Sequence, residues 1–327
     1  MITHRQRLEI CLMGDQPDRV PVALWRHFPV DDQTAEGLAA ATLQYQNTYD
    51  FDLVKVTPQS SFCVMDWGIQ QEWRGEPEGT YSYTQRVIHR PEDWYNLPML
   101  DPYTGRLGTQ LRCLEIINNS LGSHTPIIQT IFNPLSQAKN LAGGDQLLLH
   151  LRRYPEAVHA GLSIITECTR RFIDAAVKTG IAGIFYAVQH AKFHLLSVAE
   201  YKEFGRAYDL QVLGSTSDLW LNLLHLHGTE IMFSEFIDYP VQVINWHDRE
   251  TEPSLSQGLT KFPGIVCGGL QRHETLLLGT PQQIQTEAHQ AIAATGGRRL
   301  ILGTGCVAFT TVPYGNLIAA RRSVESV

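Results

Sequence analysis

Residues 221–230, LNLLHLHGTE, form an apolar run that ends in two histidines and a glycine. Because side chains alternate between the two faces of a β-strand, His225 and His227 share a face with every second leucine before them. A buried face that changes from leucine to ligand-type side chains at its C-terminal end is typical of a site at the mouth of a parallel barrel. A pair of hydrogen-bonded core histidines would give the same local pattern, so the choice depends on the rest of the chain.

Short apolar runs alternate along the chain with longer helix-like segments. Eight runs are candidate strands, at residues 20–25, 52–57, 126–132, 182–188, 220–227, 241–246, 264–268 and 299–302. Near-continuous apolar strands separated by helices indicate a parallel sheet covered on both faces. Eight such units predict an α/β fold of the (β/α)8, TIM-type barrel class. A doubly wound open sheet is the alternative, because the number of strands alone does not close a barrel.

Several helix starts are explicit in the sequence. Ser197 and Glu200 have the spacing of a capping box ahead of a helix, and Thr280 with Gln283 repeats it. Pro155 is expected to open a long helix. These signals support helices in the connections between the candidate strands.

The connection between the second and third candidate strands is unusually long. It contains QQEWRGEPEGTYSYTQRVI at 70–88, whose centre at 76–79 predicts a hairpin turn. Long connections inside a compact domain are usually lids, binding loops or added structure. We expect residues 66–124 to form an insertion that covers part of the barrel mouth, within a single domain that spans 1–327.

Composition excludes several classes of partner. The chain has 327 residues, of which 43% are hydrophobic and 18% charged, so a globular protein with a sizeable core is expected. A formal net charge of -7 and the lack of a Lys/Arg cluster argue against a nucleic-acid partner. Residues 1–19 do not resemble a signal peptide, and no run approaches the roughly 20 apolar residues of a membrane span. We therefore expect a cytoplasmic protein with no membrane partner.

The cysteines do not form a recognisable framework. All six are scattered without CxxC spacing, at Cys11, Cys63, Cys113, Cys168, Cys267 and Cys306. This spacing indicates neither a zinc knuckle nor a set of disulfides, so most are expected to be buried and reduced. Cys306 is treated separately because it follows the eighth candidate strand.

In a parallel barrel, functional side chains lie where the strands end. The polar and ligand-type residues that follow the candidate strands are Arg26, His27, Thr57, Gln59, Asn133, Gln189, His190, His225, His227, His247, Asp248, Gln271, Arg272, Thr304 and Cys306. Strand ends run into solvated loops, which accounts for many polar residues without any function. That explanation does not account for His225, His227 and Cys306 together at the mouth.

The chain resembles the uroporphyrinogen decarboxylase superfamily, which also holds the zinc-dependent cobalamin:thiol methyltransferases. The resemblance covers nearly the whole chain and rests on the order and spacing of several stretches. They are RVPVALWRHFP at 19–29, EDWYNLPMLDP at 92–102, PIIQTIFNPLSQAKNLAGG at 126–144, LSVAEYKEFGRAYDLQVL at 196–213, LLHLHG at 223–228 and GGRRLILGTGC at 296–306. The family's fold is a TIM-type barrel, which agrees with the number of candidate strands.

The true decarboxylases differ from this chain at the positions of their catalytic and substrate-binding residues. Arg26 matches one of the two arginines in a motif of the decarboxylases. Gln59 falls near the position of their catalytic aspartate. Asn140 and Thr304 stand where the decarboxylases have a tyrosine and a histidine. These departures disfavour a lyase acting on a tetrapyrrole, because one arginine cannot pair with many carboxylates.

The methyltransferase branch fits better. Its zinc site is built from an HxC motif after the fifth strand and a cysteine after the eighth. His225 is in place, His227 stands where the cysteine would be, and Cys306 supplies the distant thiolate. Two nitrogens and one sulfur suit zinc or another divalent metal, and three protein ligands leave a position for substrate. Replacing one thiolate by histidine makes the metal a stronger Lewis acid.

The resemblance therefore implies a metal-dependent enzyme that activates a thiol or similar small nucleophile for attack on a methyl group. The methyl donor would be a corrinoid carried by another protein, since no corrinoid-binding domain is recognised in the chain. His247 and Asp248 are the catalytic candidates, as acid or base groups, as a fourth ligand or as residues that orient a ligand. A homodimer is expected, because members of the superfamily are often dimers.

The remaining candidates would bind the small-molecule substrate. They are Arg26, His27, Gln59, Asn133, Gln189, His190, Arg272 and Thr304. Arg26 and Arg272 would suit a carboxylate or phosphate, although structural ion pairs would explain them equally well. A third hypothesis is a non-catalytic protein that keeps the barrel and binds a corrinoid or tetrapyrrole.

Overall fold

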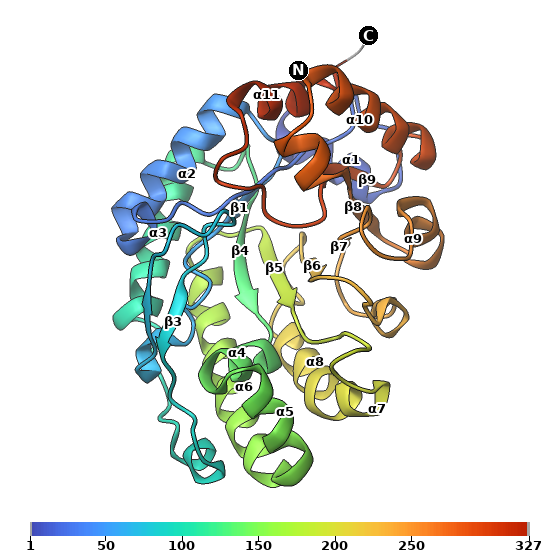
Figure 1. The fold of residues 1–327 in the computed structure, drawn as a ribbon. Coiled ribbons are helices and arrows are strands. Elements are labelled where there is room, and N and C mark those ends of the chain that lie inside the picture. The colour runs from blue at the N-terminus through green and yellow to red at the C-terminus, as the bar shows by residue number, and fades with distance from the viewer. Residues whose placement is uncertain (1, 326–327) are drawn as a thin grey trace.

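Seven parallel strands form one curved sheet in the computed structural model, which describes residues 2–325 (Figure 1). In spatial order they are β1 (Val54–Val56), β4 (Ile127–Phe132), β5 (Gly183–Val188), β6 (Leu223–Leu226), β7 (Val243–Trp246), β8 (Ile265–Leu270) and β9 (Leu300–Thr304). Every residue of these strands is buried. Both faces of the sheet are therefore covered, which is why the strands appear in the sequence as continuous apolar runs.

An extended segment at residues 20–25 lies between the two edge strands of this sheet. Val22 forms a parallel bridge with Leu302 of β9, and the Ala23 N–H donates to the Leu302 carbonyl at 2.9 Å. On the other side, the Asp52 N–H donates to the Val22 carbonyl at 2.9 Å. The segment thus closes the sheet, which confirms the TIM-type barrel and excludes the open doubly wound alternative.

The prediction of a full strand at 20–25 is nevertheless wrong, because the segment contributes only one bridge. Pro21 has no N–H to donate to a ladder. The Val22 N–H donates instead to the Asp52 carboxylate at 2.8 Å. A side chain therefore replaces part of the backbone ladder at the seam of the barrel.

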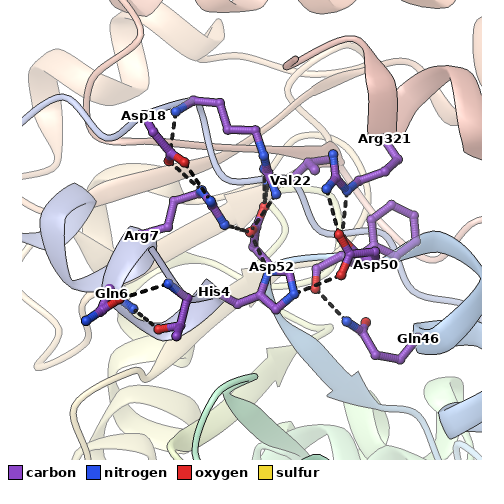
Figure 2. A network of polar contacts seen from close by, with 12 residues as sticks. His4, Gln6, Arg7, Asp18, Val22, Gln46, Asp50, Asp52 and Arg321 are labelled. Carbon is purple, nitrogen blue, oxygen red and sulfur yellow. Dashed lines mark hydrogen bonds and ion pairs between the residues drawn. The ribbon is translucent and has the colours of Figure 1, made fainter. Parts of the chain in front are cut away.

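The Asp52 carboxylate is the centre of a buried network at this seam (Figure 2). It is 0% exposed and accepts hydrogen bonds from Arg7 Nη1 at 2.7 Å, Arg19 Nη1 at 2.6 Å and a ring nitrogen of His4 at 2.8 Å. Burial alone would raise its pKa, but the hydrogen bonds from His4 and Arg19 hold the pKa of Asp52 well below its usual range. The N-terminal segment is thus fastened to the start of β1.

A second carboxylate in the same region joins the first and last helices. The Asp50 carboxylate lies 2.9 Å from His4 Nε2 and 2.7 Å from Arg321 Nη2 (Figure 2). The Asp50 carbonyl also accepts from Arg321 Nε at 2.7 Å. One residue therefore connects both ends of the described chain.

Helices cover the outside of the barrel (Figure 1). They are α1 (His4–Leu12), α2 (Ala35–Tyr49), α3 (Gly105–Leu121), α4 (Pro134–Ala142), α5 (Gly144–Arg153), α6 (Pro155–Val177), α7 (Val198–Tyr201), α8 (Ala207–Gly214), α9 (Leu255–Lys261), α10 (Pro281–Thr295) and α11 (Tyr314–Arg322). Short 3-10 helices occur at Asp31–Gln33, Met65–Trp67, Pro91–Asn96 and Phe233–Phe236, and π-helical turns at Lys202–Arg206 and Arg272–Leu277.

The predicted helix starts are confirmed. The Ser197 and Thr280 side chains accept from the N–H groups of Glu200 and Gln283, and both pairs complete a capping box. Pro155 is the first residue of α6. These devices could be recognised because they depend on residues only a few positions apart.

The long connection after β1 contains the predicted hairpin. Strands β2 (Gln70–Glu72) and β3 (Ser82–Gln85) pair antiparallel, and the Gly79 N–H donates to the Glu76 carbonyl at 2.8 Å in the turn. Within residues 66–124, α3 lies on the outside of the barrel beside α2 (Figure 1). The hairpin, rather than the whole connection, is the part that approaches the mouth.

Two further expectations concern the chain as a whole. All six cysteines are buried and none forms a disulfide. Among the described helices, none combines the length and the apolar character needed to cross a membrane.

Candidate metal centre

Four side chains meet at the C-terminal mouth of the barrel. His225 lies in β6, His227 and His247 directly follow β6 and β7, and Cys306 follows β9. One ligand atom from each lies within 4.8 Å of the others, and Cys306 Sγ is 3.6 Å from His227 Nδ1. The structure thus brings together the three predicted metal ligands and adds His247, one of the two predicted catalytic residues.

The His225 ring is fixed by a residue on the neighbouring strand. Its Nδ1 lies 2.7 Å from Asn245 Oδ1, while Asn245 Nδ2 donates to the carbonyls of Cys267 at 2.8 Å and Thr304 at 3.0 Å. Those two bonds settle the orientation of the amide, so its oxygen accepts from His225 Nδ1–H. The lone pair on His225 Nε2 is therefore available to a metal.

The His247 ring is oriented in the same way by a carboxylate. Its Nδ1 lies 3.0 Å from Glu250 Oε2, and its Nε2 is buried without a hydrogen-bond partner in the described chain. A buried polar atom without a partner is unfavourable unless a ligand satisfies it. This unsatisfied nitrogen is the feature of the cluster that fits a metal best.

The charges of the cluster also suit a cation. Burial would raise the pKa of Cys306, but contacts with His225, His227 and His247 outweigh it and hold the pKa well below its ordinary value. Burial lowers the pKa of His225, whereas contacts with Cys306 and Glu250 outweigh burial and raise the pKa of His247 to about 9, so a metal would have to displace a proton from His247. A thiolate beside a neutral imidazole is the form in which these side chains bind metal. Three nitrogens and one sulfur fit zinc in kind and number.

With all four side chains bound, a tetrahedral ion would have no free position. The expected open site then requires that substrate adds as a fifth ligand or replaces one of the four. Sequence reasoning allowed His247 as a fourth ligand, but it left a position for substrate on the assumption of three protein ligands.

A small cavity of about 70 Å³ lies over the cluster. His225, His227 and Cys306 line one part of it, and Trp25 and Phe185 supply aromatic walls. A cavity of this size holds a few water molecules or a small ligand.

The hairpin reaches this cavity through an ion-pair chain. Glu78 at its turn lines the cavity and forms an ion pair with Arg272, whose Nη1 lies 2.6 Å from Glu78 Oε1. Arg272 Nε lies 3.7 Å from Glu250 Oε1, and Glu250 in turn holds His247. The hairpin turn is also fastened to the loop after β9, where the Thr310 N–H donates to the Pro77 carbonyl at 2.8 Å.

We expect Glu250→Gln to weaken metal binding about 10- to 100-fold, because a carboxylate that accepts from a ligand histidine orients the ring and increases its basicity. Competition with a chromophoric chelator would measure the affinity. Glu167→Gln, in α6 and far from the mouth, is the matched control. An unchanged affinity in the Glu250 variant would contradict the assignment of His247 as a ligand.

Two of the predicted substrate-binding residues line the cavity, namely His27 and Gln189. Burial lowers the pKa of His27 to about 3, so its ring is neutral, and its Nδ1 has no hydrogen-bond partner in the described chain. Arg272 lies next to the cavity through its pair with Glu78. These three residues stay candidates for contact with a substrate.

Other predicted residues lie away from the cavity. Arg26 donates to the Thr310 carbonyl at 3.1 Å and lines a groove on the outer side instead. The Asp248 carboxylate accepts from the Gly269 N–H at 3.1 Å, and burial raises its pKa to about 7. Neither side chain belongs to the four-ligand cluster.

The last four candidates are buried, and three of them make hydrogen bonds within the barrel. Asn133 caps α4 and donates to the Asp209 carboxylate at 2.9 Å. Gln59 donates to Asp32 at 3.2 Å, and the Thr304 hydroxyl donates to the Cys306 carbonyl at 2.6 Å. His190 is buried but does not line the cavity. Of these, Thr304 acts closest to the cluster, because it holds the loop that carries Cys306.

Sequence reasoning missed three residues of the site. Asn245 and Glu250 hold two histidines of the cluster, and Lys55 of β1 lines the cavity. Only Lys55 left a signal in the sequence, as a charged residue between two valines of an apolar run. Asn245 is paired with His225 by strand register, which no local pattern reveals.

Fold and site together define a TIM-type barrel with a histidine and cysteine cluster at its mouth. The chain belongs to the uroporphyrinogen decarboxylase (URO-D) family, whose model matches residues 3–327. Membership agrees with the resemblance seen in the sequence motifs.

The chain is similar to named methyltransferases. Methylcobamide:CoM methyltransferase MtbA of Methanosarcina acetivorans is 24% identical over 96% of this chain and 95% of that protein. MtbA of Methanosarcina mazei is also 24% identical, over 65% of this chain and 62% of that protein. A solved methyltransferase from Methanosarcina mazei matches with a TM-score of 0.88 and 20% identity, covering 99% of both chains, which shows the same fold. Within its superfamily, the chain is thus closer to the methyltransferase branch, as the site residues predicted.

Proposed function

We propose that this protein is a metal-dependent methyltransferase that activates a thiol or similar small nucleophile at the barrel mouth. Zinc is the metal that the donor set favours, and a corrinoid carried by another protein is the proposed methyl donor. The observation that carries the proposal is the convergence of His225, His227, His247 and Cys306, with an unsatisfied nitrogen on His247. The printed names of the relatives, which are methylcobamide methyltransferases, support the reaction class.

The four cluster residues would hold the metal. When bound, zinc would lower the pKa of an incoming thiol and so favour its nucleophilic thiolate form at neutral pH. The chain's own residues prepare this site, since Asn245 and Glu250 fix two of the ligand rings. Trp25 and Phe185 give the cavity an apolar wall that limits water beside the reacting group.

The decarboxylase alternative is less well supported by the same geometry. A substrate with many carboxylates would need several cationic side chains around the cavity over the cluster. Arg26, the arginine retained from the decarboxylase motif, is bonded to a backbone carbonyl outside this cavity. Among the described residues, Lys55 is the one lysine or arginine that lines this cavity, which does not match a substrate with many carboxylates.

The test begins with elemental analysis of protein purified without an affinity tag. We expect about one zinc ion per chain and transfer of the methyl group of methylcobalamin to a small thiol. Chelation should abolish transfer, and added zinc should restore it. Protein that binds no metal even after supplementation would overturn the proposal. Porphyrinogen turnover without metal would favour the lyase, and a stoichiometric chromophore without turnover would favour a binding protein.

A further inference from the structure

The hairpin formed by β2 and β3 is not part of the barrel sheet. Among the described strands, these two pair only with each other and form a separate sheet. A two-stranded hairpin is marginally stable by itself, so its position depends on side-chain contacts with the barrel. These contacts form two groups, one along the strands of the hairpin and one at its turn.

The strands of the hairpin are held by a buried carboxylate. The Tyr81 hydroxyl donates to Asp32 Oδ1 at 2.8 Å, and Gln59 Nε2 donates to the same oxygen at 3.2 Å. Gln71 Nε2 of β2 donates in turn to Gln59 Oε1 at 2.9 Å. None of these bonds involves the turn at 76–79, so the strands can stay in place while the turn moves.

The turn itself lies close against the mouth of the barrel. A Cβ atom added at Gly79 would lie 2.5 Å from His27 Cβ and 3.2 Å from Thr310 Cγ2. Gly79 also has a φ of +82°, in the left-handed region that favours glycine. Glu78 lines the mouth cavity. The position of the turn therefore decides whether this side of the cavity is closed.

Arg272 lies between a carboxylate of the turn and a carboxylate of the barrel. Its Nη1 is 2.6 Å from Glu78 Oε1, and its Nε is 3.7 Å from Glu250 Oε1. The guanidinium also lies over the Phe309 ring, with its Cζ 5.0 Å from the ring centroid. The Arg272 side chain is only 13% exposed, so water and salt screen its ion pairs less than those of surface residues.

Glu250 is shared between Arg272 and the metal-ligand cluster. Its Oε1 faces Arg272, while its Oε2 lies 3.0 Å from His247 Nδ1. If the turn left the mouth, Arg272 would lose Glu78, and Glu250 would be its nearest carboxylate. The Arg272 charge would then compete with His247 for Glu250. The hydrogen bond that orients the His247 ring would weaken as a result.

We propose that the turn at 76–79 is a lid whose closure strengthens metal binding, and that Glu78 and Arg272 are positioning residues that act on His247 through Glu250. The closed turn does so by holding Arg272 away from Glu250. This inference rests on the metal site of the proposed function, but it does not depend on methyl transfer. Because coupling between two equilibria is reciprocal, a metal that binds better to the closed form must also favour closure.

The first test follows the turn by limited proteolysis. Trypsin cleaves after Arg74, which is exposed beside the turn, and cleavage should be faster when the turn is open. Zinc should slow cleavage of the metal-free wild type at this site by about fivefold or more. Glu78→Gln should lose this protection, and Glu76→Gln, an exposed residue of the same turn, should keep it. Equal protection of the wild type and Glu78→Gln would overturn the proposal.

The second test measures zinc affinity by competition with a chromophoric chelator. Glu78→Gln should weaken zinc binding by about fivefold or more, because Arg272 then competes for Glu250. Adding Arg272→Met to this variant should restore the affinity to within about threefold of the wild type, because the competing charge is gone. A merely structural role would make the two substitutions additive. An affinity that falls further in the double variant would therefore contradict the assignment.

Gly79→Ala opens the turn without changing any charge. The added methyl group cannot fit against His27, so cleavage after Arg74 should be faster than in the wild type. Zinc affinity should fall to about the same extent as in Glu78→Gln. Faster cleavage with unchanged zinc affinity would show that the turn moves independently of the metal, and it would overturn the coupling.

These outcomes separate the lid from the proposed function. Equal zinc affinity in the wild type and in all the turn variants would remove the lid and keep the metal site. A wild type that binds no zinc would remove both. Coupling between the turn and zinc in a protein that transfers no methyl group would keep the lid and remove the proposed methyltransferase.

Discussion

Cys306→Ala is expected to leave the protein without stoichiometric metal and to lower methyl transfer by about a thousandfold or more, since loss of a direct ligand costs more than the 10- to 100-fold typical of groups that only orient ligands. Cys306 is the one sulfur among the four side chains of the cluster, and its neighbours hold it as a thiolate. Without it, three imidazoles remain and the cluster loses its thiolate. Elemental analysis and the methylcobalamin assay would measure both losses.

Cys113→Ala is the matched control for this substitution. Cys113 is equally buried but lies in α3 on the outside of the barrel. The control variant should lose some stability through the cavity it creates, yet it should retain about one metal ion per chain. A full complement of metal in Cys306→Ala would show that the thiolate is not a ligand, and the proposed function would then lose its main structural support.

Asp52→Asn is expected to lower the free energy of unfolding at pH 7 by about 3–5 kcal/mol, the usual effect of removing one partner from a buried ion pair. Arg7 and Arg19 would keep their charges beside a neutral amide. The amide would also supply one acceptor oxygen in place of two, although the carboxylate binds several donors. Urea denaturation followed by circular dichroism would measure the change, with Asp145→Asn, exposed in α5, as the control.

Asp52 also makes the stability of the folded protein depend on pH. The folded state holds the pKa of Asp52 below its unfolded value of about 3.9, so the ionised carboxylate stabilises the fold fully above that pH. This contribution is lost as the pH falls from about 4 through the folded pKa. The stability of the wild type should therefore fall more steeply below pH 4 than that of Asp52→Asn. Parallel curves for the two proteins would contradict the network.

Most of the barrel could be predicted because its signals are local. Seven candidate strands became strands, and Ser197 and Thr280 cap helices as expected. The segment at 20–25 could not be predicted in detail, because its pairing depends on a proline and on the Asp52 side chain far along the sequence. The apolar sequence of this segment indicated that it is buried, but it could not indicate the partners of its hydrogen bonds.

The site was predictable to the extent that its residues follow strand ends. His225, His227 and Cys306 converge as the family resemblance implied, and His247 joins them from the next strand. Proximity to a strand end did not distinguish these residues from Asp248, which turns toward β8. Lys55 was overlooked because it lies inside a strand, where we expected packing residues only.

The contacts of the Asp50 carboxylate indicate that the order of the chain segments could be changed by circular permutation. It contacts His4 of α1 and Arg321 of α11, so the two helices at opposite ends of the sequence are neighbours at the barrel seam. A short peptide linker could join these ends, and new termini could be opened at the exposed turn at 122–123, between α3 and β4. Such a circular permutant would keep every pair of neighbouring strands. The residues of the mouth cluster would lie far from both new termini in the sequence.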